Sequence, residues 1–219
     1  MVQNCSRLSP GRLFRAGIGV VTLGLASVTL VACSSSSPSL YSLQPVAARV
    51  PAVNSSFLPL SVPTLVEVRN PTIPQTLDRD RIVLGDGGFK LDVSPSDSWS
   101  EPLSSQIPHV LTSDLRQRLP GTSFFAQDDA TATTPQAYVE LVVNRFSRDA
   151  AGNAVLEAQV SVHRADADAV KTNRSLHLSQ PAPAGTEGLV SALSALLGQV
   201  ADQVSQDLKS LPPEPTEAK

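Results

Sequence analysis

Cys33 is the side chain best placed to do chemistry, because its thiol ends an uncharged apolar segment. Arg7, Arg12 and Arg15 precede this segment, which runs from residue 16 to residue 31. The motif Leu30-Val31-Ala32-Cys33 overlaps its end. A basic region, an apolar region and a small-residue cleavage site, in that order, are typical of a secretory signal peptide, and the last four residues match the bacterial lipobox. We therefore expect cleavage after residue 32 and lipidation of Cys33.

The expected modification uses thiolate as the nucleophile that accepts a diacylglycerol, and an acyl chain such as palmitate on the new N-terminus. Two or three acyl chains on one residue hold a protein durably on a membrane. A transmembrane helix is the alternative, but the apolar run of about 16 residues is shorter than the ~20 that a span needs. Ser34 follows the cysteine, as is usual in outer-membrane lipoproteins of Gram-negative bacteria.

The remaining reactive side chains do not form a recognisable catalytic or metal-binding pattern. His109, His163 and His177 have neither an i, i+4 partner nor Cys and His neighbours at metal-ligand spacing. The chain contains no Gly-x-Ser-x-Gly and no Walker A sequence. The segment 85–88 is rich in glycine, but an alternating strand pattern follows it, which predicts a tight turn. We expect no enzyme activity, no metal and no cofactor.

Charge and cysteine content narrow the class of protein further. Loss of residues 1–32 removes three of the 17 basic residues, which leaves 14 against 20 acidic ones and a net charge of −6. This charge argues against nucleic-acid binding. Cys5 would leave with the signal peptide and Cys33 would carry lipid, so no disulfide is expected.

The composition along the chain predicts a division into four parts. Residues 1–32 are the expected signal peptide, and residues 33–39 a lipidated, serine-rich tether. Residues 40–211 form the expected periplasmic domain. Residues 212–219 are rich in Pro and Glu and are expected to be a disordered tail.

Two segments show the spacing of three and four between apolar residues that is typical of amphipathic helices, residues 101–119 and residues 186–211. Ser100 can cap the first helix. Pro108 lies inside the same helix and predicts a kink or a late start. Both helices are expected to bury one face.

Strand patterns fill the rest of the expected domain. Three alternating runs near residues 139–143, 156–162 and 173–178 predict an antiparallel meander, in which Val143 opposes Ala158 and His177 opposes Glu157 on the solvent face. An earlier strand is expected within residues 57–70, and a hairpin from residues 82–84 and 89–91. The expected fold is α+β, a two-layer sandwich of a mainly antiparallel sheet with two amphipathic helices on one face.

Several short motifs occur in a characteristic order. Tyr41-Ser42-Leu43 follows the lipobox, and the segments 73–83, 99–103 and 110–120 read IPQTLDRDRIV, WSEPL and VLTSDLRQRLP. This pattern resembles the PqiC-type family of ABC-transport auxiliary lipoproteins. The chain departs from the family pattern at Asp80, where proline is usual.

The resemblance implies an outer-membrane lipid anchor, a domain facing the periplasm, and partnership with an MCE-domain protein and an inner-membrane permease of the same transport system. It also allows for a homo-oligomer, and it implies no catalytic residues. The motif segments are either a partner-binding surface or a structural signature of the fold. The candidate partner-binding residues are Leu77, Asp78, Arg79, Ile82, Trp99, Glu101, Pro102 and Leu103.

Two functions from different classes remain open. The chain could dock a lipid-transport conduit to the outer membrane, which predicts a closed core and an exposed apolar or aromatic patch. Alternatively, it could itself bind a lipid or other hydrophobic ligand in a groove between helices and sheet, which predicts an open apolar cavity. A hydrolase is disfavoured because the sequence shows no nucleophile constellation.

Overall fold

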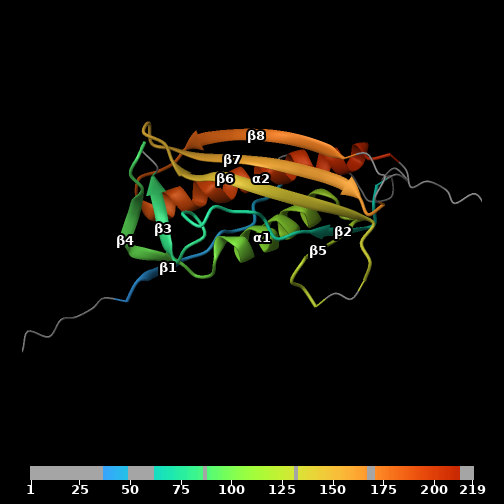
Figure 1. The fold of residues 1–219 in the computed structure, drawn as a ribbon, viewed down its shortest axis with the longest axis horizontal. Helices are drawn as coiled ribbons and strands as arrows, with labels where there is room; N and C mark the ends of the chain where they lie inside the picture. The colour runs from blue at the N-terminus through green and yellow to red at the C-terminus, as the bar shows by residue number, and fades with distance from the viewer. Residues whose placement is uncertain (1–36, 49–61, 86–87, 131–132, 167–170, 213–219) are drawn as a thin grey trace, which may run out of the picture. The chain divides into compact units, whose positions relative to one another are not determined.

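The computed structural model describes residues 37–48, 62–85, 88–130, 133–166 and 171–212 (Figure 1). The expected signal peptide, Cys33, most of the tether, the tail beyond residue 212 and the first part of the strand expected in residues 57–70 lie outside these ranges. From residue 37 onward the chain forms one compact unit.

Eight strands and two helices occur within the described residues. Their order along the chain is β1 (Ser39–Tyr41), β2 (Leu65–Val68), β3 (Arg81–Gly85), β4 (Asp92–Trp99), α1 (Leu103–Arg118), β5 (Ser123–Ala126), β6 (Ala137–Arg148), β7 (Asn153–Arg164), β8 (Thr172–Pro181) and α2 (Gly185–Ser210).

The strands form one mixed sheet, so the prediction of a mainly antiparallel sheet is wrong. β6–β7, β7–β8 and β3–β4 are antiparallel, whereas β1–β4, β2–β5, β2–β6 and β3–β6 are parallel. Parallel neighbours need a long crossover connection. The connection from β2 to its parallel neighbour β5 contains β3, β4 and α1, so it is long enough to return the chain to the same end of the sheet.

The long strand β6 organises the sheet. β7 pairs along one edge of β6, while the other edge is shared by β2 near Val139 and by β3 at Arg148. A single bridge from Thr72 to Val142 lies between these two pairings. The sheet therefore divides into two arms, β2–β5 and β3–β4–β1.

The register predicted for the meander is confirmed. Val143 pairs with Ala158, and Glu157 pairs with His177. Nδ1 of His177 lies 3.3 Å from Oε1 of Glu157, and both side chains are exposed to solvent, as predicted.

α1 begins at Leu103, so Pro108 lies inside the helix and does not delay its start. The prediction that Ser100 caps this helix is wrong, because the N-cap residue is Pro102. Ser100 instead donates its backbone N–H to the carbonyl of Tyr41. The second predicted helix is confirmed as α2, which starts and ends within one residue of the expected bounds.

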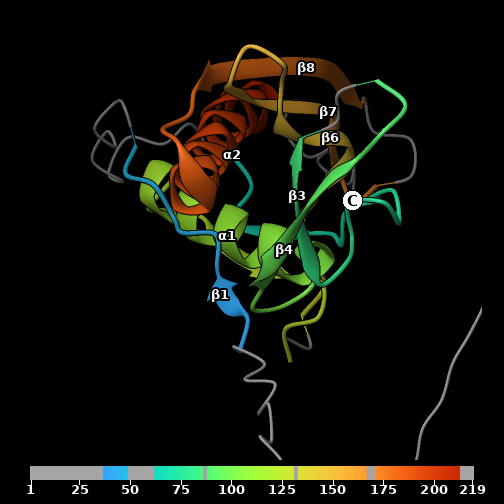
Figure 2. The ribbon, with the colours of Figure 1, turned by 90° about the vertical axis from the view of Figure 1, so that its left-hand side faces the viewer.

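The core lies between the helices and the sheet. α2 runs along β6, β7 and β8, α1 lies against β2 and β5, and the two helices contact each other. The end-on view in Figure 2 shows α2 directly beneath the β6–β8 meander. The largest fully buried side chains include Phe146, Ile82, Leu103, Ile107, Leu111, Leu115, Leu156, Leu193, Leu196 and Leu197.

The predicted hairpin is only partly correct. β3 contains residues 82–84, but the second arm begins at Asp92, so residues 89–91 are not a strand. Phe89 is fully exposed and has no apolar face of the sheet to pack on. Gly88 adopts a φ of 76°, a left-handed conformation that glycine tolerates without strain. Residues 86–87 lie outside the described ranges. Of the strand expected in residues 57–70, the structure describes residues 62–70, and within these the strand is Leu65–Val68.

Candidate functional site

The motif segments 41–43, 74–82 and 99–103 meet beside the N-terminus of α1, and we call them the signature cluster. The parallel pairing of β1 with β4 places Tyr41 next to Trp99. The Ser100 N–H donates to the Tyr41 carbonyl at 2.8 Å, and the hydroxyls of Ser42 and Ser100 are 2.6 Å apart. The first and third segments are therefore joined through backbone and side chains.

Asp78 links the middle segment to α1. Its Oδ1 accepts a hydrogen bond from the backbone N–H of Ser104 at 3.0 Å. Ser104 is in the first turn of α1, where backbone N–H groups have no partner within the helix. A carboxylate at this position also interacts favourably with the positive end of the helix dipole. Asp78 therefore caps α1 from outside the helix.

The middle and third segments are also joined through the backbone. Leu77 and Asp78 donate their N–H groups to the carbonyl of Pro74, which closes a turn, and Trp99 donates its N–H to the carbonyl of Asp80 at 2.8 Å. This last bond uses only the carbonyl of Asp80, which the proline usual in the family would also supply. The departure from the family pattern at this position is thus compatible with the same turn.

Burial divides the eight candidate partner-binding residues into three groups. Leu77, Ile82, Trp99 and Leu103 are at most 5% exposed and belong to the core. Asp78 is half-buried at the helix cap. The exposed members are Arg79, Glu101 and Pro102. The structure brings all eight together, but only these last three present a surface to a partner.

The residues after β1 form what we call the strap, residues 42–46, which crosses α1 and α2. The Leu43 N–H donates to Oε1 of Gln106 on α1 at 2.9 Å, and the Gln44 N–H donates to Oγ of Ser194 on α2 at 3.1 Å. The Val46 N–H donates to Oδ1 of Asp114 at 2.6 Å. Side chains of both helices thus replace the strand partner that an extended backbone usually has.

A buried arginine, Arg118, binds the last residue of the strap and both helices. Arg118 donates to the carbonyls of Val46, Asp114 and Gly198 at 3.2, 2.9 and 2.9 Å, and its Nε donates to Oδ1 of Asp202 at 2.6 Å. These groups belong to the strap, α1 and α2. Gly198 permits the close approach, because a Cβ at this position would lie 3.2 Å from Cβ of Val46.

Asp114 lies beneath the strap and is fully buried. The pKa of this carboxyl is raised from 3.8 to about 6, chiefly by burial and to a smaller extent by the nearby Asp202. The Val46 N–H and the Arg118 guanidinium act in the opposite direction. Oδ2 of Asp114 has no hydrogen-bond partner within the described residues. The strap therefore rests on a carboxylate whose charge is costly at neutral pH.

Sequence reasoning missed the roles of Asp114 and Arg118. A signal was present, because the two residues are four positions apart and each precedes a buried leucine, Leu115 or Leu119. Two opposite charges at i and i+4 at the margin of an apolar stripe indicate a pair buried with that stripe.

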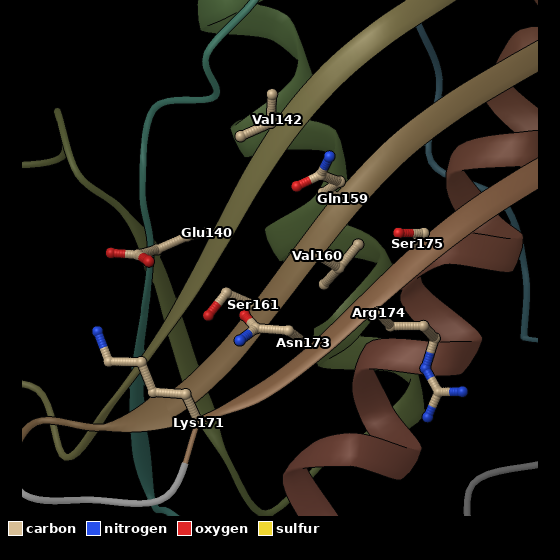
Figure 3. A pocket seen from close by; sticks show the side chains of 9 residues that line it. All are labelled: Glu140, Val142, Gln159, Val160, Ser161, Lys171, Asn173, Arg174 and Ser175. Carbon is tan, nitrogen blue, oxygen red and sulfur yellow. The ribbon is translucent and has the colours of Figure 1, made fainter.

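The outer face of β6–β8 carries a shallow concavity of about 350 Å³ (Figure 3). Most of its lining residues are polar or charged by type, among them Glu140, Gln159, Ser161, Lys171 and Asn173. The close-up shows these side chains spread along the strands rather than gathered around one point. This concavity lies on the far side of the sheet from α2 and does not match the apolar groove that the ligand-binding hypothesis requires.

The histidines have ordinary polar neighbours. His109 lies 3.6 Å from Asp129, and His163 is buried with its ring centroid 5.5 Å from that of Tyr138. Within the described ranges, no group of three or more His, Cys, Asp or Glu side chains is arranged to hold a metal ion. In the same part of the chain, no helix combines the length and the apolar character needed to cross a membrane.

These features define a small α+β domain whose N-terminal strand is built into its signature cluster. The chain belongs to the family of ABC-type transport auxiliary lipoprotein components, whose family model matches residues 41–205. The match begins at Tyr41 in β1 and includes the strap, α1 and most of α2. The family is one of transport components and is not a known enzyme family. No curated protein matches this chain.

Two solved structures share the fold. The crystal structure of an uncharacterized protein is 16% identical, with a TM-score of 0.61, and the match covers 79% of this chain and 99% of that one. The crystal structure of XCC0632 from Xanthomonas campestris, of the DUF330 family, is 18% identical, with a TM-score of 0.62 and coverage of 78% and 94%.

Proposed function

We propose that this chain is the auxiliary lipoprotein that docks an ABC/MCE-type transport conduit to the outer membrane. The lipobox at Cys33 provides the anchor, and the domain faces the periplasm. The partners are an MCE-domain protein and, through it, an inner-membrane permease of the same system. Family membership supports the transport role, and Ser34 after the lipobox supports placement in the outer membrane.

The observation that carries the docking role is the rigid presentation of the exposed part of the signature cluster. Arg79, Glu101 and Pro102 are exposed, while their neighbours Leu77 and Trp99 are buried. A surface that is already ordered loses less conformational entropy on binding. Three segments that are distant in sequence are thus held in a fixed arrangement beside the strand that leads toward Cys33.

The closed core favours docking over lipid binding by the domain itself. The space between α2 and the meander is filled by side chains such as Leu156, Leu193 and Leu197, each fully buried. A site for a lipid chain would need an open apolar cavity there. The concavity on the outer face of the sheet does not reach this space. A second concavity, of about 340 Å³, lies where β8 meets α2, but apart from Leu176 and Leu178 its lining residues are polar or charged.

The test places a photo-crosslinking residue at position 79 or 101 of the full-length, lipidated protein in intact envelopes. We expect covalent adducts with an MCE-domain protein. Arg79→Glu and Glu101→Lys should each reduce its co-purification. Lys171→Glu, a matched charge reversal on the outer sheet face, should leave it unchanged. The melting temperature of each variant checks that the domain is folded.

The outcome that overturns the proposal is equally specific. Adducts absent from both positions, together with stoichiometric phospholipid retained by the purified protein, would favour the ligand-binding function. Adducts between two copies of the chain at these positions would instead identify the cluster as the contact of a homo-oligomer.

A further inference from the structure

β8 is the longest free edge of the sheet. Among the described residues the sheet ends at β1, β5 and β8, each of which pairs with one neighbouring strand. β1 and β5 contain three and four residues, whereas β8 contains ten and forms the upper edge of the sheet in Figure 1. Every second residue of an edge strand directs its N–H and C=O groups away from the sheet. β8 therefore presents a long row of backbone donors and acceptors.

The central part of this edge lacks the features that usually prevent the addition of another strand. Charged side chains and proline protect many natural sheet edges. In β8 these residues are Arg174 and Pro181, which lie toward the two ends of the strand. Residues 175–179 read SLHLS and carry no permanent charge. We call residues 175–179 the open edge.

A shallow groove follows the open edge, at the second concavity, where β8 meets α2. It is lined by residues 175–178 of β8 and by Gln199, Asp202 and Gln203 of α2. Leu176 and Leu178 pack against the core but are only partly buried. An edge strand beside a side-chain groove is the arrangement used in recognition by strand addition, where main-chain bonds give affinity and alternate side chains give specificity.

The charged groups beside the groove are neutralised within the molecule. Arg174 donates to both carboxylate oxygens of Asp207, at 2.7 and 3.3 Å. Nε of Arg118 donates to Oδ1 of Asp202 at 2.6 Å. Because both carboxylates already have a cation, the groove offers amide, hydroxyl and apolar groups to a ligand. This chemistry suits an uncharged ligand.

We propose that the open edge binds an extended, uncharged polypeptide segment of a partner protein, which adds to β8 as a further strand. The backbone of such a segment matches the spacing of donors and acceptors along β8, which neither an acyl chain nor a sugar provides. Apolar side chains at every second position would cover Leu176 and Leu178. The polar side chains between them would lie on the outer face of the sheet, beside Ser175 and His177.

A segment of another protein suits this edge better than a second copy of the chain. A second β8 would bring ten residues, so its own Arg174 and Pro181 would lie within the contact. A short segment needs only the open edge, about 17 Å of extended chain. This binding depends neither on the lipid anchor nor on docking through the signature cluster, which is built on β1, β3 and β4.

The first test measures hydrogen exchange of the full-length, lipidated protein at single-residue resolution. The probe is a short peptide with blocked ends that alternates threonine and valine. We expect the peptide to slow exchange at alternate residues of the open edge, because only every second N–H points away from β7. Unchanged exchange, or protection confined to α2, would overturn the proposal.

A matched peptide tests the role of the main chain. Proline at its two central positions removes one N–H group from each edge of the peptide. We expect this peptide to bind more weakly by roughly tenfold or more, because main-chain hydrogen bonds are lost. Equal affinity of the two peptides would overturn binding by strand addition.

A pair of variants tests the position of the site. Gln203→Trp fills the groove from α2, and Gln206→Trp places the same side chain at an exposed position outside the groove. Gln203→Trp should weaken binding of the threonine–valine peptide by roughly tenfold, while Gln206→Trp leaves it unchanged. Both variants should keep the melting temperature of the unmodified protein, because neither glutamine is in the core. Equal affinities of the two variants would overturn the proposal.

A photo-crosslinking residue at position 177, in the full-length protein in intact envelopes, tests the source of the segment. Adducts confined to one short segment of another protein, and lost in Gln203→Trp but not in Gln206→Trp, support the proposal. Adducts between two copies of the chain, adducts within one copy, or no adducts at all would overturn it. Crosslinking at positions 79 and 101 reports docking through the signature cluster separately.

Discussion

Oδ1 of Asp78 accepts a hydrogen bond from the backbone N–H of Ser104 at 3.0 Å, and this bond joins the middle signature segment to the first turn of α1, 26 residues further along the chain. An N-cap residue usually accepts a hydrogen bond from an N–H group in the first turn of its helix, and here the distant Asp78 accepts that bond for α1. Asp78 therefore has a role in stabilising the fold, so this part of the sequence signature does not require a binding partner to explain it.

Asp78→Ala should therefore lower the free energy of unfolding by about 1 kcal/mol, the usual cost of losing a helix cap. Asp78→Asn keeps an acceptor oxygen and should lose less. Urea denaturation followed by Trp99 fluorescence measures both changes. Arg79→Ala removes an exposed neighbour and should stay close to the unmodified protein. Equal stability of Asp78→Ala and the unmodified chain would show that the bond does not stabilise the helix.

The local parts of the fold could be predicted from the sequence because local patterns determine them. Alternation of apolar and polar residues gave the register of the β6–β8 meander, including the pair of Glu157 with His177. A shift by one residue would have moved every apolar side chain to solvent. Helix periodicity located α1 and α2 for the same reason.

The mixed sheet and the helix cap depend on contacts between distant segments. Nothing in the residues around β2 indicates that it pairs with both β5 and β6 in parallel. Ser100 is a better cap than Pro102 by residue type, yet the carboxylate that caps α1 comes from Asp78. Such long-range choices follow from the assembled topology and have no local signal.

Arg118 is expected to be among the most sensitive positions of the chain. Arg118→Met removes the guanidinium that faces Asp114 and Asp202, and it leaves the buried Asp114 carboxylate without its nearest cation. Breaking a buried pair from one side typically costs about 3–5 kcal/mol. Urea denaturation measures the loss.

The double variant Arg118→Met/Asp114→Asn checks the cause of that loss. It should recover part of the stability, because the fully buried carboxylate is replaced by a neutral amide and only the partly exposed Asp202 is left without the guanidinium. Arg79→Met, which removes an exposed arginine, should have little effect. A double variant no more stable than Arg118→Met would show that the carbonyl contacts of Arg118, and not the buried charge, account for its contribution.

Gly188 marks a tight contact at the start of α2. A Cβ at this position would lie 2.4 Å from the carbonyl oxygen of Pro183, which is backbone and cannot rotate away. Arg148 holds the same carbonyl at 2.9 Å. Gly188→Ala should lower the free energy of unfolding by about 1–3 kcal/mol, as overpacking does. Ser191→Ala, an exposed change on the same helix, should be neutral. A Gly188→Ala variant as stable as Ser191→Ala would contradict this geometry.

Asp114 predicts an unusual pH dependence of stability. Its pKa is about 6 in the folded chain, against an ordinary value of 3.8, so the folded state binds more protons than the unfolded state between these values. The Asp114 contribution therefore increases the free energy of unfolding as the pH falls through this window, and this stabilisation is lost as the pH rises through 6. The shift corresponds to up to about 3 kcal/mol.

Asp114→Asn isolates this contribution from other groups. The hydrogen bond from Thr186 lowers the pKa of Asp97, and the hydrogen bonds from Asn153 lower the pKa of Asp149, both from the ordinary value of 3.8. The stability that these two carboxyls contribute is lost only as the pH falls below this value, so they add no pH dependence between pH 5 and pH 8. The asparagine keeps an oxygen for the Val46 N–H but carries no charge at any pH. We expect the stability difference between the variant and the unmodified protein to grow in favour of the variant from pH 5 to pH 8. Thermal denaturation across this range measures it, and a difference independent of pH would show that Asp114 does not titrate in the folded protein.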